Sequence, residues 1–303
     1  MPYRLATYHA ADKVSRAGII VGDTIYNLEA EANEAGLSLD ANPVRLVSFF
    51  QVWESVKGGI AKIAAKPKTK GEPLASVTLE APIQYPGVLY MAGANYADHL
   101  KEMGANIPNK AEANPFFFVK TTRGTIIGPG ETIVLPPYSQ TVDWEAEVAM
   151  VIGKEGKNLT VDNAMDCVAG YTIVNDLSAR DRAKRDDIPF RFDWIGHKCF
   201  DTSGPMGPVV TPADQIGDPD NLSIKLWVND TLHQNSNTSN LIWNYPELLA
   251  WLTRHVTVYP GDVVATGTPA GVGAGKNEFL QDGDTIRIQI ENIGELVNPV
   301  VRK

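Results

Sequence analysis

The sequence predicts an α+β fold that is rich in β-structure. From residue 81 onward, short apolar segments of strand length alternate with Gly and Pro, and few segments have a helical period. Residues 1–80 differ, because short strands are followed there by a helical and lysine-rich stretch. We therefore expect a small N-terminal β/α domain over residues 1–80 and a β-rich domain, closed or folded on itself, over residues 81–303.

The N-terminal segment has an alternating pattern followed by a helical one. Three strands of a small meander are expected at residues 3–8, 17–21 and 24–28, with a tight turn at Gly22-Asp23. Residues 43–55 are expected to be helical. Residues 57–70 contain five lysines, which favours a helix that ends in a solvated connector before residue 80.

Three elements of the larger domain have clear local signals. Residues 227–232 predict a hairpin, since Asn229-Asp230 tolerates the positive φ of a tight turn. Residues 246–252 predict the clearest helix, with a proline in its first turn. Residues 95–104 predict a short helix that is capped by Asn95 and ends at Gly104.

Composition excludes several classes of protein. The net charge of −9 and the pI near 5.1 argue against a nucleic-acid-binding surface, which normally needs a basic face. No uncharged apolar run approaches the roughly 20 residues that span a bilayer, and no signal peptide is visible, so no membrane partner is expected. Cys167 and Cys199 form no Cys-x-x-Cys motif, and we expect reduced thiols in the cytoplasm.

Two acidic residues begin a segment that otherwise has the pattern of a buried strand. Glu145 and Glu147 precede the apolar run 148–152, and the period of two places them on one face. Such close like charges need a positive partner. A Mg²⁺ or Mn²⁺ ion would provide it, with a third carboxylate from Asp176 at the end of the apolar run 170–175. The alternative is a solvent-facing edge strand whose acids pair with lysines; Asp143 is interpreted as a turn residue, and Asp181 and Asp201 as further candidate ligands.

A histidine and a glutamate on the short helix form a second candidate. His99 and Glu102 are three residues apart and therefore neighbours on a helix. The carboxylate would raise the basicity of the imidazole and make His99 a general base toward water. The alternative is an ordinary surface pair.

Several cations and one turn are candidates for substrate binding. Arg180 and Arg185 belong to an arginine-rich stretch that we interpret either as a lid for substrate carboxylates or as a surface loop. Lys198 is suited to holding an enolate or a carboxylate. The segment from Gly267 to residue 276 fails the Walker pattern at residues 270 and 277, and we interpret it as a rigid turn presenting backbone N–H groups and the hydroxyl of Thr268.

Together these motifs resemble the fumarylacetoacetate hydrolase family, in the bacterial form with a small N-terminal domain. The motifs lie in the family's order at residues 93–103 (GANYADHLKEM), 143–147 (DWEAE), 170–181 (GYTIVNDLSARD), 198–202 (KCFDT) and 259–273 (YPGDVVATGTPAGVG). The resemblance implies a mixed β-roll, a homodimer, and Mg²⁺ or Mn²⁺ held by Glu145, Glu147 and Asp176. It also implies a water-activating dyad of His99 and Glu102, and substrate contacts from Lys198 and Thr268.

The resemblance implies hydrolysis of a C–C bond in a small anionic keto acid, a 2,4-diketo acid of acylpyruvate type, through a metal-bound enolate. Decarboxylation or isomerisation of 2-hydroxymuconate-type dicarboxylic acids is an alternative, and a non-catalytic acid-binding module is another. Ala183 stands where the acylpyruvase and oxaloacetate decarboxylase branch has glutamine. This departure argues against transferring the exact activity of that branch. The arginine-bearing lid and Trp194 suggest a larger or more highly charged acid, such as an aromatic-ring-cleavage product or a diketo sugar acid.

Overall fold

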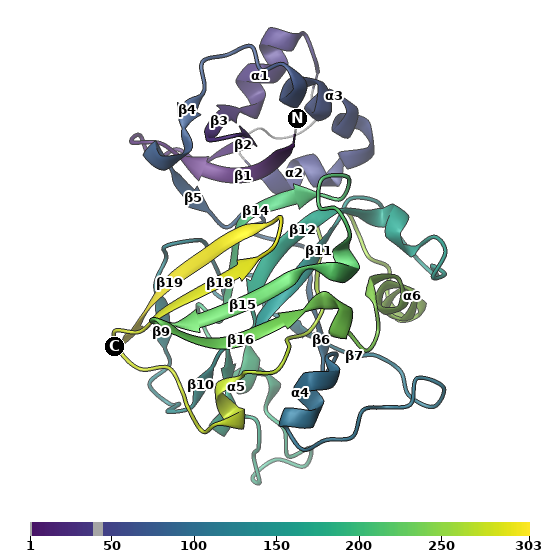
Figure 1. Ribbon diagram of the computed structural model, residues 1–303, viewed down its shortest axis with the longest axis vertical. Helices are drawn as coiled ribbons and strands as arrows, with labels where there is room; N and C mark the ends of the chain where they lie inside the picture. The colour runs from purple at the N-terminus through teal and green to yellow at the C-terminus, as the bar shows by residue number, and fades with distance from the viewer. Residues whose placement is uncertain (1, 39–44) are drawn as a thin grey trace.

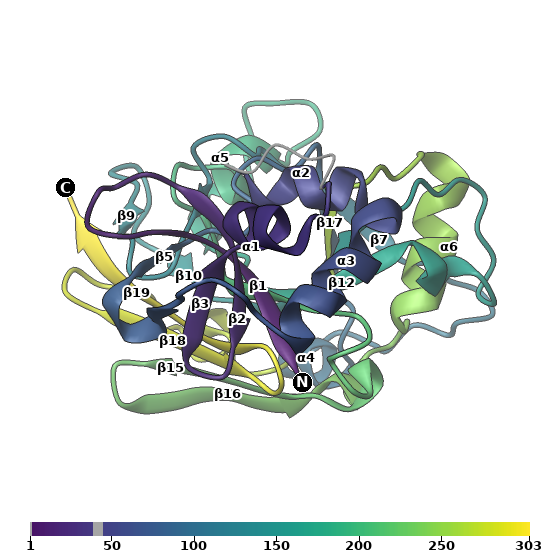
Figure 2. The same cartoon turned by 90° about the horizontal axis from the view of Figure 1, so that it is seen from above.

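The computed structural model describes residues 2–38 and 45–303. A small N-terminal unit lies at one end of the molecule, at the top of Figure 1, and its helices cover one side of its strands. Seen from above, helix α6 and the C-terminal strands lie at opposite sides of the molecule (Figure 2). The described strands form three sheets of 12, 2 and 5 strands, which confirms the β-rich α+β class.

The expected N-terminal meander is confirmed. Its strands are β1 (Tyr3–His9), β2 (Arg16–Val21) and β3 (Thr24–Asn27), followed by α1 (Leu28–Ala35), α2 (Leu46–Gln51), α3 (Trp53–Ala65), β4 (Glu72–Pro73) and β5 (Thr78–Glu80). The helix expected at residues 43–55 is confirmed from Leu46, and residues 43–44 lie outside the described part of the chain. A short break at Val52 divides it from α3.

The large sheet passes through both parts of the chain. Its further strands are β6 (Leu89–Gly93), β7 (Phe116–Lys120), β8 (Ile126–Ile127), β11 (Ala146–Ile152), β12 (Val168–Asn175), β14 (Gly204–Pro212) and β17 (Val263–Ala265). Strand β1 pairs with β14 through Leu5 and Val210, and apolar side chains of both parts share one core cluster. The N-terminal strands therefore extend the large sheet, and the division at residue 80 stays a prediction.

A second sheet packs against the first. It contains β9 (Ile133–Leu135), β15 (Ser223–Val228), β16 (Thr231–Asn237), β18 (Thr285–Ile290) and β19 (Gly294–Arg302). Side chains of β11 and β12 share a core cluster with those of β15 and β18, so the chain folds back on itself as expected. The hairpin expected at residues 227–232 is confirmed, and Asn229 has the positive φ of 53° that its turn requires.

The remaining elements are short. They are α4 (Ala97–Glu102), α5 (Trp194–Lys198), α6 (Tyr245–His255), the paired strands β10 (Val142–Asp143) and β13 (Ser178–Ala179), and 3₁₀ turns at Leu74–Ser76, Ala164–Cys167, Arg180–Arg182, Pro219–Asn221, Thr238–Asn240 and Gly273–Gly275. Helix α6 confirms the helix expected at residues 246–252, and its capping box joins Asn244 and Glu247. Among the described residues, none of the helices combines the length and apolar character that a membrane crossing requires.

The predicted cap of helix α4 is wrong. The helix begins at Ala97 after Tyr96, and Asn95 is not its N-cap. The side-chain amide of Asn95 is buried and bonds instead to the backbone of Trp243 and to the carbonyl of Thr266. A buried amide is stabilised by such partners, and here they tie the strand end before α4 to two distant loops.

Candidate functional site

Three carboxylates meet at one end of the central strands. Antiparallel pairing of β11 with β12 places Ala146 opposite Asn175, so the residues flanking this pair come together. Oxygens of Glu145, Glu147 and Asp176 all lie within 4.8 Å of one another, and the three side chains are buried. The structure therefore brings together the three acids that the sequence selected, and their role as metal ligands stays a prediction.

The donor set fits a hard divalent cation. Mg²⁺ and Mn²⁺ take oxygen ligands, and three buried carboxylates at this spacing offer them. Burial and the charges of Asp176 and Glu145 raise the pKa of Glu147 well above its usual range. The alternative of a solvent-facing edge strand is wrong, because β11 lies between β12 and β17 inside the sheet.

Two buried lysines balance part of this charge. The Nζ atom of Lys198, at the end of α5, lies 2.9 Å from Glu145 Oε2 and 2.6 Å from Asp176 Oδ2. Burial opposes the charge on Lys198, but Asp176 and Glu145 outweigh that effect and raise its pKa. Lys120, at the end of β7, lies 2.7 Å from the other oxygen of Asp176.

Sequence reasoning missed Lys120, although a signal was present. Residues two apart on a strand share a face, so Phe116, Phe118 and Lys120 point to the same side of β7. Lys120 is a charged residue at the end of an otherwise apolar strand. The argument that selected Glu145, a charge beside an apolar run, therefore also applies to Lys120.

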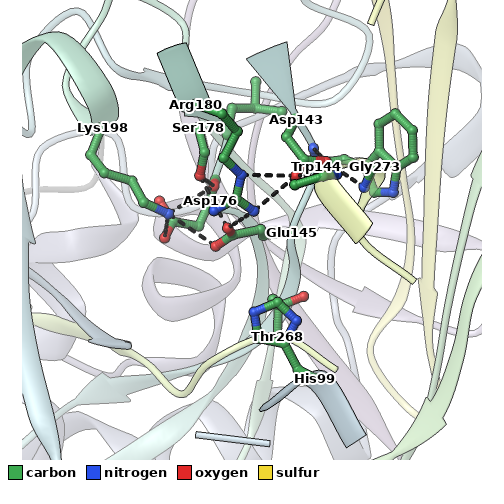
Figure 3. A network of polar contacts seen from close by, with 12 residues as sticks. His99, Asp143, Trp144, Glu145, Asp176, Ser178, Arg180, Lys198, Thr268 and Gly273 are labelled. Atoms are coloured by element: carbon green, nitrogen blue, oxygen red, sulfur yellow. Dashed lines mark hydrogen bonds and ion pairs between the residues drawn. The ribbon is translucent and has the colours of Figure 1, made fainter. Parts of the chain in front are cut away.

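Arg180 and Asp143 extend the network on the other side of Glu145. Arg180 donates from Nη2 to Glu145 Oε1 at 2.6 Å and from Nε to Asp143 Oδ2 at 2.9 Å (Figure 3). Burial opposes ionisation of Glu145, but the charges of Lys198 and Arg180 outweigh it and hold its pKa well below the usual range. Arg180 thus contacts one of the three clustered carboxylates directly.

The interpretation of Asp143 as a turn residue is wrong. Asp143 is buried in β10 and accepts hydrogen bonds from the backbone N–H groups of Gly273 and Ala274, at 2.6 and 3.0 Å. Buried charges are retained where they are paired and hydrogen-bonded, as here. Asp143 therefore connects the glycine-rich turn with Arg180 and the carboxylates.

The predicted dyad lies at the same pocket. His99 lines the pocket, and its Nδ1 atom lies 3.6 Å from Glu102 Oε2, which is longer than a hydrogen bond. Both side chains are largely buried, unlike an ordinary surface pair. Glu102 accepts the N–H of Gly271 with both oxygens at 3.0 Å, which holds its carboxylate beside the imidazole.

The turn after β17 approaches the carboxylates closely. The N–H of Gly267, where φ is +97°, donates to Glu147 Oε2 at 2.8 Å. The hydroxyl of Thr268 donates to the carbonyl of Ala146 and accepts from Gln234, and Thr268 lines the pocket. Gly267 thus contacts a candidate metal ligand, while Thr268 is the member of the turn that faces the pocket space.

The other candidate cation and acids lie elsewhere. Arg185 pairs with Asp187 and Asp193 on a neighbouring hollow, and the structure does not bring it to the carboxylates. Asp181 accepts hydrogen bonds from Ser139 and from the backbone of Gln140. Neither Asp181 nor Asp201 belongs to the three-carboxylate cluster.

The pocket that these residues enclose has a volume of about 190 Å³. Its charged end holds His99, Glu145, Glu147, Asp176, Arg180, Lys198 and Thr268, and the rest of its lining is Ala92, Gly93, Ala94, Phe116, Phe118 and Trp194. A pocket of this size and polarity fits a small acid whose polar end is held by charged side chains.

Comparison with known proteins identifies the family of the chain's larger part. Residues 89–301 match the family model described as "Fumarylacetoacetate (FAA) hydrolase C-terminal". The chain is 39% identical over 263 residues to the oxaloacetate tautomerase Fahd2a, mitochondrial, of Rattus norvegicus, which covers 86% of this chain and 81% of that protein.

Solved structures of enzymes are similar over almost the whole chain. The maleylpyruvate hydrolase from Sphingobium sp. SYK-6, solved with manganese(II) ion and pyruvate, is 32% identical with a TM-score of 0.77, and 99% of each chain is covered. The 5-carboxymethyl-2-hydroxymuconate delta-isomerase from Mycobacterium smegmatis is 32% identical with a TM-score of 0.74 and the same coverage. Hydrolases and isomerases of small acids thus share this fold.

Proposed function

Because the chain belongs to the fumarylacetoacetate hydrolase family and is an enzyme of small acids, we propose that it is a divalent-metal-dependent hydrolase of 2,4-diketo acids of acylpyruvate type. The observation that carries this proposal is the cluster of three buried carboxylates beside His99 in one pocket. The alternative of a non-catalytic acid-binding module is set aside, since relatives of this similarity are enzymes.

Glu145, Glu147 and Asp176 would hold Mg²⁺ or Mn²⁺. When bound, such an ion supplies positive charge that favours chelation of the keto acid and the departure of a pyruvate-type carbanion. The manganese(II) ion and pyruvate in the maleylpyruvate hydrolase structure support this choice of metal and ligand class. Lys198, already paired with two of these carboxylates, adds positive charge at the same end of the pocket.

His99 would perform the proton transfers. It takes a proton from water as the water oxygen attacks the carbonyl distal to the substrate carboxylate, and Glu102 holds the charged imidazole. The bond between that carbonyl carbon and the methylene carbon then breaks, and its electron pair stays on the methylene carbon. The proton returns to this carbon, so that the diketo acid and one water give a carboxylic acid and pyruvate.

Tautomerisation is the second candidate, since the rat relative is an oxaloacetate tautomerase. The same dyad would then move a proton at the carbon next to the keto group, and water would not attack. Ala183 departs from the glutamine of the acylpyruvase and oxaloacetate decarboxylase branch, so the exact activity of that branch does not carry over to this chain.

Product analysis separates the candidates. We expect the Mn²⁺-loaded protein to convert acetylpyruvate into acetate and pyruvate by NMR, to lose this activity with a chelator, and to regain it with Mn²⁺ or Mg²⁺. His99→Ala should abolish cleavage while Mn²⁺ still binds in calorimetry. No turnover of any 2,4-diketo acid, with rapid enol–keto exchange of oxaloacetate, would assign the tautomerase function instead.

Two further properties belong to this proposal. Assembly as a homodimer is expected from the family resemblance and is measured directly by light scattering on the purified chain. The cytoplasmic location stays a prediction, and the mitochondrial location in the rat relative's name is the competing possibility.

A further inference from the structure

The substrate pocket has a charged end and an aromatic wall. Phe116 and Phe118 share one face of β7, and Trp194 begins α5 across from them. The ring centroids of Trp194 lie 4.6 Å from those of Phe118 and 5.9 Å from those of Phe116, at near-perpendicular angles. All three line the same pocket as the carboxylates, and we call them the aromatic wall.

Trp194 of the aromatic wall packs against a further ring, and Phe116 of the wall is exposed. Phe192 packs against Trp194 with ring centroids 4.6 Å apart, outside the pocket lining. The Nζ atom of Lys198 lies 5.2 Å from the ring centroid of Phe118. The aromatic wall is therefore adjacent to the charged end of the pocket. Phe116 is 54% exposed, which leaves its ring accessible to a group that extends from the pocket.

Positive charge is confined to the other end of the pocket. Among the described residues that line it, Arg180 and Lys198 are the only arginine or lysine side chains, and each is already paired with carboxylates. Arg185 is paired with two aspartates in a separate hollow. A second substrate carboxylate placed against the wall would lose water without gaining a cation.

We propose that the aromatic wall selects 2,4-diketo acids whose acyl group is apolar or aromatic over those that carry a carboxylate at the distal end. This inference rests on the proposed function and names its substrate class. An apolar acyl group removes its own surface and that of three rings from water, while the keto acid end stays at the carboxylates. It replaces the sequence-based expectation of a more highly charged acid.

A matched pair of substrates tests the proposal. The compounds 2,4-dioxoheptanoate and 2,4-dioxoheptanedioate differ only in a terminal methyl or carboxylate group. We expect kcat/KM of the Mn²⁺-loaded enzyme to be at least about tenfold higher for the first, in the range that one pocket contact contributes to discrimination. 4-Phenyl-2,4-dioxobutanoate should exceed acetylpyruvate, which has only a methyl group to place there.

Variants of the wall locate the effect. Trp194→Ala should lower the preference for the phenyl compound over acetylpyruvate by about tenfold. Because the indole N–H of Trp194 is buried without a partner among the described residues, Trp194→Phe, which keeps a ring but no donor, should retain most of the preference. Phe190→Ala is the control, since Phe190 is 91% exposed and outside the pocket lining.

Failure of the inference and failure of the proposed function give different results. Preference for the dicarboxylate, or an equal loss on all substrates in Trp194→Ala, overturns the inference while hydrolysis stands. If neither heptanoate compound is cleaved, the proposed function fails. The two compounds are then not consumed, and their dissociation constants for the Mn²⁺-loaded protein can be measured by calorimetry. Comparison of the two constants tests the selectivity without turnover.

Discussion

The Nζ atom of Lys120 lies 2.7 Å from Oδ1 of Asp176, and both side chains are closed to solvent. Lys198 lies at the other oxygen of the same carboxylate. A buried ion pair costs desolvation, and removal of one partner leaves the other charge unbalanced. Asp176 is therefore set between two cations from different elements, β7 and α5, at the point where a divalent ion is expected.

Replacing Lys120 should separate its structural effect from the effect of metal. We expect Lys120→Met to lower the free energy of unfolding in chelator by about 3 kcal/mol, the scale for one broken partner of a buried pair. Added Mn²⁺ should recover part of this loss, because the ion also balances Asp176. Urea denaturation with chelator and with Mn²⁺ measures both quantities.

The control for this variant is Lys57→Met, since Lys57 forms an exposed pair with Glu54. An exposed pair contributes at most about 1 kcal/mol, and no response to Mn²⁺ is expected. Equal stability of Lys120→Met and the unmodified chain in chelator would show that Lys120 does not balance Asp176.

Glu147→Gln should weaken metal binding without disrupting the turn after β17. The amide keeps an acceptor for the N–H of Gly267, but unlike the carboxyl group of Glu147 it cannot lose a proton and become an anionic ligand. Loss of a residue that only supports a metal ligand weakens metal binding by roughly 10- to 100-fold. We expect the Mn²⁺ dissociation constant of Glu147→Gln to rise by at least this factor. Calorimetric titration of the metal-free protein measures it. The exposed Glu155→Gln is the matched control, and an unchanged constant in Glu147→Gln would remove Glu147 from the ligand set.

The sequence predicts most of the fold because its strands carry local signals. Alternation located the meander at residues 3–28, and the Asn229 turn located the β15–β16 hairpin. Sequence patterns do not state which strands pair over long distances. The joining of β1 to β14 brings together residues about 200 positions apart, and only the tertiary packing of the shared core determines it.

The site was predictable where residues of unusual type interrupt apolar runs. Glu145, Glu147 and Asp176 are such interruptions, and the structure brings them together. Asp143 was missed because its local sequence also suits a turn, and its burial follows from the distant backbone of Gly273. The prediction for Asp143 was therefore wrong because its hydrogen-bond partners are distant in the sequence.

Asp143 should contribute strongly to stability. Asp143→Ala leaves Arg180 without one of its two partners and removes the acceptor of three backbone N–H groups, those of Trp144, Gly273 and Ala274. We expect the free energy of unfolding to fall by about 3 kcal/mol or more, with a smaller loss in Asp143→Asn, which keeps one acceptor oxygen. Urea denaturation measures both variants. Equal losses in the two would indicate that only the charge matters, against the assignment of the N–H contacts.

A buried histidine next to Lys198 should make stability depend on pH. Burial, with the nearby charge of Lys198, lowers the pKa of His197 from 6.5 to about 4. In the unfolded chain a histidine titrates near 6.5. Between about pH 4 and pH 6.5 the unfolded state binds more protons at this residue than the folded state does. The free energy of unfolding therefore increases as pH rises through this window and decreases as pH falls through it. The expected loss between pH 7 and pH 5 from this residue is about 2 kcal/mol.

His197→Asn isolates this effect, since an amide can still donate to the carbonyl of Ala179, which lies 3.0 Å from Nδ1 of His197. Urea denaturation at pH 7 and pH 5 should show a smaller difference in this variant than in the unmodified chain, by about 2 kcal/mol. His255→Asn, at an exposed position, should leave the difference unchanged. If His197→Asn keeps the full difference between pH 7 and pH 5, the prediction is wrong. The proton that the chain takes up on unfolding would then bind to a group other than His197.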